Sequence, residues 1–323
     1  ALLAEECSPR AGGDPMSTTI SDTGAIAAVK AEQRGAPISR WQLFAVLFKV
    51  RVVVLLLFAA VGGAFLAAGG MPASGSLGVL LLAGGLAASG SAALNEYYER
   101  ASDSLMIRTR LRPLVTGAIE RPAWVPYASA LMIIAPCLAV LPFNAALAFF
   151  LFLGAVIYVG VYTLWLKPRT LVNIIIGGAA GSAAVLSGSA AVGAWNNPGA
   201  LVLAALLFAW TPTHFWSLAI VYREDYLVGG TPMLPARVSV RQSAWWVLLH
   251  TAATALAALS LAVLPGLDWL YTVPVSAATV ALLALNIGLI ARPQVEAARR
   301  LFHASNLYLV IVLLMICVDI LIT

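Results

Sequence analysis

The chain has 323 residues, of which 61% are hydrophobic and only 10% are charged, and its formal net charge is +5. A typical globular chain carries about 25% charged residues, so this composition excludes an ordinary soluble domain. Long apolar stretches recur along nearly the whole chain, and within lipid only helices or closed barrels satisfy their backbone groups. Because these stretches lack period-two alternation, the sequence predicts an all-α, polytopic membrane protein.

The beginning of the chain differs from the remainder. Residues 1–40 are rich in small, polar and charged side chains and have no sustained apolar face. Such a composition predicts a disordered cytosolic N-terminal tail. The membrane domain is then expected over residues 41–323.

Nine membrane spans are predicted, because a helix needs roughly 20 mostly apolar residues to cross the hydrocarbon core. In chain order they are Phe44–Ala68, Leu77–Tyr97, Ala123–Leu141, Ala145–Leu166, Leu171–Ala194, Ala200–Tyr222, Ala244–Leu264, Trp269–Ala291 and Leu301–Leu321.

The connections between these spans alternate in charge. The N-terminal tail and the even-numbered connections place all 19 Lys and Arg residues on, or near, one side of the membrane. The odd-numbered connections are short and contain neither residue type. Since a positive excess marks the cytoplasmic side, the pattern predicts a cytoplasmic N-terminus and a C-terminus outside.

Three oxygen-bearing side chains share one helical face where the second span ends. Asn95, Glu99 and Asp103 are spaced i, i+4 and i+8. Mg²⁺ is typically bound by one or two carboxylates together with substrate phosphates. The spacing therefore favours a metal site, and the alternative is a polar helix end that is solvated at the membrane surface.

Basic residues are close to this acidic face. They are Arg108, Arg110 and Arg112, which follow within ten residues, and Lys49 and Arg51 at the predicted cytoplasmic start of the first span. Arg and Lys beside metal-binding carboxylates suit a diphosphate group. Every cytoplasmic loop is expected to be basic, so only the closeness of these residues to the acids is informative.

Several motifs together resemble a known family. Asn95-x3-Glu99-x3-Asp103, with the segment 108–117 that follows, resembles the first signature of the intramembrane (UbiA-type) prenyltransferase superfamily. Three further stretches resemble its protoheme IX farnesyltransferase (haem O synthase) branch. They are Tyr158–Lys167, Asn173–Gly181, and Trp210–Trp216 with its continuation from Arg223 to Pro235. The similarity covers about Lys49 to Asp319, in the same order.

The resemblance implies a fold and a reaction. The fold is nine transmembrane helices around a central cavity. The reaction is transfer of a farnesyl group from farnesyl diphosphate to a vinyl group of haem b, which gives haem O for haem–copper oxidases, with Mg²⁺ as cofactor. The implied location is the bacterial cytoplasmic (inner) membrane, in contact with lipid. Haem A synthase or oxidase assembly proteins are the implied protein partners, and nucleic acid is not expected as a partner.

The family's functional residues carry over to positions of this chain. The implied metal ligands are Asn95, Glu99, Asp103 and Asp225, and the first three, with Arg112 and Lys167, are the implied catalytic residues. The implied substrate-binding residues are Lys49, Arg51, Arg108, Tyr158, Tyr162, His214, Arg223, Glu224 and Asp225. Glu99 stands where the family usually has Asp, and Ala101 where it often has an acid.

Some alternatives stay open at this point. His214 contacts haem or transfers protons, or it is a hydrogen-bonded structural residue. Tyr158 and Tyr162 face an allylic cation through their rings, or they pack between helices. An aromatic quinone precursor could replace haem as acceptor. A transporter or a catalytically weakened, non-enzymatic membrane subunit would explain Ala101.

Overall fold

The structure is a computed structural model that describes residues 39–264 and 266–322. The predicted N-terminal tail therefore lies outside the described residues, except for its last two positions. All regular elements in the described ranges are helices, which confirms the all-α prediction.

The helices have the following bounds in chain order. They are α2 (Arg40–Leu47), α3 (Val50–Ala68), α4 (Ser74–Asp103), α5 (Pro113–Thr116), α6 (Trp124–Val140), α7 (Ala145–Ala155), the π-helix η1 (Val156–Leu166), α8 (Asn173–Gly177), α9 (Ala179–Ala191), α10 (Pro198–Val221), α11 (Arg223–Val228), α12 (Leu234–Arg237), α13 (Val240–Leu261), α14 (Trp269–Ala291) and α15 (Val295–Ile322).

Eight helical stretches of the described chain are long and apolar enough to cross a membrane. They coincide with the predicted first, second, and fourth to ninth spans. The third predicted span corresponds to α6, a shorter apolar helix of 17 residues. The multi-pass membrane architecture is confirmed, whereas the count of nine spans and the sides of the two termini stay predictions.

The first predicted span is wrong at its beginning. The segment from Phe44 to Leu47 belongs to the separate helix α2, and α3 begins only at Val50. Lys49 between them has φ +47° and ψ +47°, the left-handed conformation. That conformation interrupts the α-helical backbone, and it is uncommon for any residue other than glycine.

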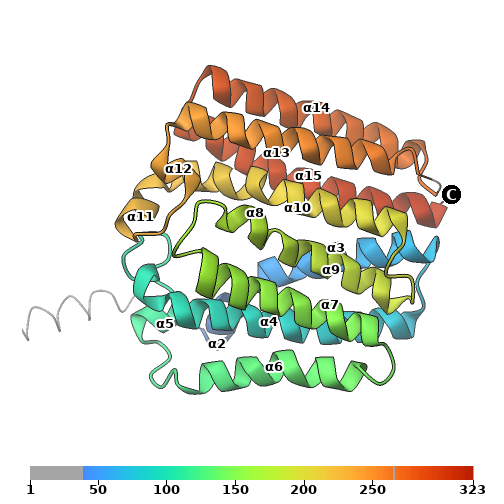
Figure 1. The fold of residues 1–323 in the computed structure, drawn as a ribbon, viewed down its shortest axis with the longest axis horizontal. Helices are drawn as coiled ribbons and strands as arrows, with labels where there is room; N and C mark the ends of the chain where they lie inside the picture. The colour runs from blue at the N-terminus through green and yellow to red at the C-terminus, as the bar shows by residue number, and fades with distance from the viewer. Residues whose placement is uncertain (1–38, 265, 323) are drawn as a thin grey trace, which may run out of the picture. The chain divides into compact units, whose positions relative to one another are not determined.

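The long helices form a bundle in which α10 is central. It packs against α13, α15, α9 and α3, while α4 packs against α6 and α3. Figure 1 shows α14 and α6 at opposite edges of the bundle. Close helix contact depends on small residues, because a Cβ atom at Gly188 of α9 would overlap the carbonyl group of Ala60 in α3.

The two ends of the bundle differ in their connections. The short helices α5, α11 and α12 lie together at one end, and the C-terminus lies at the other (Figure 1). We call the first the basic end, because its connections carry the Arg and Lys residues of the loops. The opposite end consists of the short connections 69–73, 141–144, 192–197 and 262–268, in which only residue 265 is not described.

Candidate active site

The acidic face predicted after the second span lies on α4 itself. This helix continues to Asp103, so Asn95, Glu99 and Asp103 occupy its last turns at the basic end. Their exposed fractions are 2%, 9% and 3%. A polar helix end solvated at the membrane surface would leave these side chains exposed, so their burial excludes that alternative.

Asp103 pairs with an arginine from the turn that follows α4. Arg112 Nη1 lies 2.6 Å from Asp103 Oδ2, and Arg112 Nε lies 3.6 Å from Glu96 Oε1. Burial alone would lower the pKa of Arg112, but the carboxylates of Asp103 and Glu96 outweigh it and raise this pKa above its ordinary value. The guanidinium group therefore stays charged beside two carboxylates.

Glu99 pairs with the lysine that follows η1. Lys167 Nζ lies 2.5 Å from Glu99 Oε1, and 5.6 Å from the centre of the Tyr162 ring. The backbone N–H of Lys167 donates to the carbonyl of Tyr162, five residues back, at 2.8 Å. This is the hydrogen-bond pattern of a π-helix, a rare form that is frequent at functional sites.

Lys49 approaches the same face from the break between α2 and α3. Its Nζ donates to Asn95 Oδ1 and lies 3.4 Å from the hydroxyl oxygen of Tyr158. Asn95 Nδ2 donates in turn to Thr163 Oγ1 at 3.0 Å. Burial, and next the nearby guanidinium of Arg112, lower the pKa of Lys49 to about 8. The left-handed backbone at Lys49 thus turns a cation toward the acidic face.

Two tyrosines of η1 form the apolar wall of this region. The rings of Tyr158 and Tyr162 stack with centroids 5.8 Å apart and an interplanar angle of 18°. Lys49 Nζ lies 5.9 Å from the centre of the Tyr158 ring. Each ring therefore already interacts with a cation, which is the chemistry that a cationic fragment of a substrate would need.

The second predicted acidic site is only partly assembled. Asp225 of α11 is buried, and its Oδ2 accepts a hydrogen bond from the backbone N–H of Arg108 at 3.0 Å. The Arg108 guanidinium lies 5.7 Å from the Tyr222 ring centre. Asp225 therefore contacts the connection that joins Asp103 to Arg112, whereas Glu224 is exposed.

Two other predicted substrate contacts have different surroundings. Arg51 is exposed on α3, and among the described residues it forms no ion pair with the acidic face. Arg223 is half-buried. The structure therefore gathers Lys49, but not Arg51, beside the acids.

His214 lies in α10 within a stack of rings. Its ring is 4.5 Å from that of Trp210 at an interplanar angle of 14°, and 4.7 Å from that of Phe302. Its Nδ1 lies 3.0 Å from Ser305 Oγ. This geometry supports the hydrogen-bonded structural interpretation, and a contact with haem stays a prediction.

The donor set of the acidic face fits a divalent cation bound together with phosphate. Within residues 39–264 and 266–322, no three His, Cys, Asp or Glu side chains converge as a ready ion site. Instead, the carboxylates of Glu99 and Asp103 each face a cation. Their oxygens and the amide oxygen of Asn95 are hard ligands of the kind that Mg²⁺ prefers. Glu96 Oε2 is buried without a hydrogen-bond partner, which leaves one further oxygen available.

Unpaired polar atoms gather at the basic end. Six buried side-chain atoms there have no hydrogen-bond partner in the described part of the chain. They are Glu96 Oε2, Thr116 Oγ1, Thr170 Oγ1, Asn173 Oδ1, Arg223 Nε and Tyr226 Oη. Buried polar groups are normally hydrogen-bonded, so this concentration is expected where a polar ligand or water binds.

Sequence reasoning missed Glu96, Thr163 and Asn173. The signal for Glu96 was present, because it adjoins Asn95 in the same motif. Glu96 follows Asn95 directly, however, so its side chain points about 100° away from the predicted face. It meets Arg112 because the buried surface of α4 is wide enough to include it. No local pattern indicates the contacts of Thr163 or Asn173.

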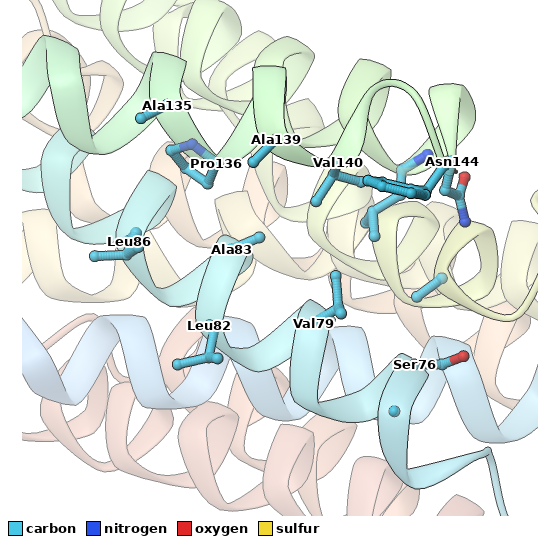
Figure 2. Close-up of a pocket in the computed structure, with 14 residues that line it drawn as sticks. Ser76, Val79, Leu82, Ala83, Leu86, Ala135, Pro136, Ala139, Val140 and Asn144 are labelled. Carbon is cyan, nitrogen blue, oxygen red and sulfur yellow. Dashed lines mark hydrogen bonds between the residues drawn. The ribbon is translucent and has the colours of Figure 1, made fainter.

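A hollow of about 750 Å³ lies elsewhere in the molecule. It is formed between α4, α6 and the start of α7, close to the opposite end, and its lining includes Val79, Ala83, Ala139 and Asn144. Figure 2 shows the largely apolar side chains around it. It includes none of the residues of the acidic face, so it is not the predicted central cavity, which stays a prediction.

These features agree with a known family of membrane enzymes. Residues 55–310 match the model of the UbiA prenyltransferase family. The chain belongs to this family.

Individual relatives refine this membership. The chain is 39% identical, over 282 residues, to the protoheme IX farnesyltransferase 2 of Paramagnetospirillum magneticum. This match covers 86% of this chain and 96% of that relative. A solved structure of a digeranylgeranylglyceryl phosphate synthase has a TM-score of 0.72 and 15% identity, and the match covers 87% of this chain and 98% of that one. A UbiA homolog from Archaeoglobus fulgidus, bound to DMAPP and Mg²⁺, has a TM-score of 0.61 and 17% identity, with 85% and 99% covered. At these identities the two structures show the shared fold.

Proposed function

We propose that this prenyltransferase transfers a farnesyl group from farnesyl diphosphate to a vinyl group of haem b, in the bacterial cytoplasmic membrane, and so forms haem O. The observation that carries the proposal is the buried acidic face of α4, where Asn95, Glu99 and Asp103 each lie beside a cation. The 39% identity to a protein named protoheme IX farnesyltransferase supports haem as the acceptor over a quinone precursor.

Diphosphate binding is an exchange of partners at the acidic face. Arg112 and Lys167 now neutralise Asp103 and Glu99, and the same two cations can donate to phosphate oxygens. The carboxylates and the Asn95 amide oxygen would then hold Mg²⁺. The UbiA homolog from Archaeoglobus fulgidus, which shares the fold, is bound to DMAPP and Mg²⁺. Bound Mg²⁺ would add positive charge beside the diphosphate as it leaves.

Bond cleavage then depends on charge at two places. The allylic carbon–oxygen bond breaks, and its electron pair leaves with the diphosphate toward Arg112, Lys167 and Lys49. The remaining allylic fragment is cationic, and the stacked faces of Tyr158 and Tyr162 can stabilise it. The vinyl carbon of haem forms the new bond, and water supplies the hydroxyl group of the product and releases one proton.

Asp225 is the further ligand that we propose for the metal–diphosphate group. Its contact with the backbone of Arg108 places α11 against the connection that carries Arg112. The exposed Glu224 and the half-buried Arg223 lie beside it in sequence, and we propose that a soluble diphosphate enters near them. Haem A synthase or oxidase assembly proteins stay predicted partners.

The direct test is an assay of the purified protein in liposomes with haem b, farnesyl diphosphate and Mg²⁺. We expect haem O to accumulate, as resolved by chromatography of extracted pigment, and a chelator to stop its formation. Unchanged haem b in the presence of Mg²⁺ would overturn the haem proposal. Prenylation of a quinone precursor in a parallel reaction would then identify the other acceptor class.

A further inference from the structure

Asn173 is a fully buried polar residue that the mechanism above does not use. It is the first residue of α8, and its exposed fraction is 0%. Its Nδ2 donates to the carbonyl oxygens of Thr170 at 2.6 Å and of Pro232 at 3.0 Å. These two bonds use both hydrogens of the amide group.

The two acceptors belong to different parts of the basic end. Thr170 lies in the connection 167–172, which joins η1 to α8 and begins with Lys167. Pro232 lies in the connection between α11 and α12, next to the fully buried Met233. Asn173 Nδ2 is also 3.5 Å from the carbonyl oxygen of Lys167. The amide group of Asn173 therefore links the turn that carries Lys167 to the connection between α11 and α12.

The position of this turn decides where Lys167 reaches. The Nζ atom of Lys167 lies 2.5 Å from Glu99 Oε1 on a different helix, so a small displacement of the turn breaks this contact. The connection 167–172 makes no other side-chain hydrogen bond to the segment between α11 and α12 among the described residues. Displacement of a charged donor weakens its bonds steeply, because hydrogen bonds depend strongly on distance and angle.

We infer that Asn173 is a positioning residue for Lys167, whose amide group holds the 167–172 turn so that the ammonium group meets the diphosphate. The inference rests on the proposed function, since it assigns Asn173 a role at that same diphosphate site. A positioning role requires no direct contact between Asn173 and the substrate. Its effect is transmitted through the backbone of the turn, and so depends on the presence of the Lys167 side chain.

A double-mutant cycle tests this dependence, with Mg²⁺ and inorganic pyrophosphate as the probe. In the Lys167 background we expect Asn173→Ala to weaken pyrophosphate affinity about five- to tenfold. In the Lys167→Ala background the same change should have almost no further effect, because the group that Asn173 positions has been removed. An equal loss in both backgrounds would overturn the inference.

Asn144 provides a matched control at the opposite end. Its Nδ2 donates to the carbonyl oxygen of Ala190 at 2.7 Å, and its Oδ1 accepts from the Leu147 N–H at 2.9 Å. Asn144→Ala should lower the thermal midpoint but leave pyrophosphate affinity unchanged. A comparable loss of affinity in Asn144→Ala would mean that general destabilisation explains both variants, and would contradict a positioning role.

A milder variant covers the case in which Asn173→Ala does not fold. The hydroxyl group of Asn173→Ser can reach the Thr170 carbonyl three residues back, but it is too short to reach Pro232. We expect this variant to fold and to lose affinity only where Lys167 is present, and wild-type affinity would contradict the inference. A wild-type protein that binds no pyrophosphate would refute the proposed function itself, whereas wild-type binding that Asn173 does not affect refutes the inference alone.

Discussion

Both ends of the bundle bury carboxylates, but the partners of these carboxylates differ. At the basic end, Glu99 and Asp103 lie 2.5 and 2.6 Å from the side-chain cations of Lys167 and Arg112. At the opposite end, Asp319 of α15 is completely buried and accepts a hydrogen bond from the backbone N–H of Asp268. A side-chain cation can move to a ligand, whereas a backbone partner is fixed by the fold.

The two ends also show that the size of a hollow does not locate the site. The hollow of about 750 Å³ lies near the opposite end and is lined largely by apolar side chains (Figure 2). The basic end instead concentrates acids, cations and unpaired buried atoms. We therefore expect diphosphate to bind and react at the basic end, and we expect the contacts at the opposite end to stabilise the fold. Four changes can break or sharpen this contrast.

The largest effect is expected from Asp103→Ala. The change removes the carboxylate that we propose as a metal ligand and leaves Arg112 without its closest partner, so turnover should fall at least about 100-fold. Haem O formation by the purified variant is the measurement, and an unchanged circular dichroism spectrum verifies the fold. Full retained activity would contradict the metal role of this face.

A smaller loss is expected from Lys167→Ala. It removes one proposed charge-assisted contact to the diphosphate, which is equivalent to about 10- to 100-fold in affinity. The loss should appear mainly as a higher KM for farnesyl diphosphate, and Lys167→Arg should recover part of it. An unchanged KM with a lower kcat would show that Lys167 acts only after the diphosphate has bound.

Asp319→Ala should affect stability and not catalysis. It removes the fully buried carboxylate that accepts from the Asp268 N–H, at a cost of about 1–3 kcal/mol in the free energy of unfolding. A lower thermal midpoint with unchanged kcat and KM is the expected result. A specific loss of turnover in the folded variant would mean that the two ends are not functionally distinct.

The smallest effect is expected from Ala139→Phe, which fills part of the hollow. Ala139 is exposed and lines the hollow far from the acidic face. The kcat and KM of the Ala139→Phe variant should stay within about twofold of the wild-type values, as for most surface changes. A large rise in the KM for farnesyl diphosphate would show instead that the donor chain extends into this hollow.

Much of the architecture was predictable from the sequence because each membrane span is a local apolar run. The same holds for the acidic face, since the spacing of Asn95, Glu99 and Asp103 is set by one helix. The left-handed break at Lys49 was not predictable, because neither glycine nor proline marks it in the sequence, and its contact with Asn95 joins two distant segments.

The contacts between distant segments were also beyond the sequence. Nothing near Lys167 in sequence indicates Glu99 as its partner, 68 residues away. The π-helix that presents Tyr158 and Tyr162 has no sequence signal of its own. The exposure of Arg51 likewise depends on how α3 is rotated, although Arg51 and Lys49 are only two residues apart.

The proposal that Glu99 and Asp103 exchange their present cation partners for Mg²⁺ is tested most directly by pyrophosphate binding with and without Mg²⁺. The measurement compares the wild-type protein with the charge-neutral, similarly sized Glu99→Gln/Asp103→Asn variant by titration calorimetry. We expect saturable binding by the wild type in Mg²⁺, and at least about tenfold weaker binding both in chelator and in the variant. Equal affinity under all three conditions would contradict the central claim that these carboxylates hold the metal–diphosphate group.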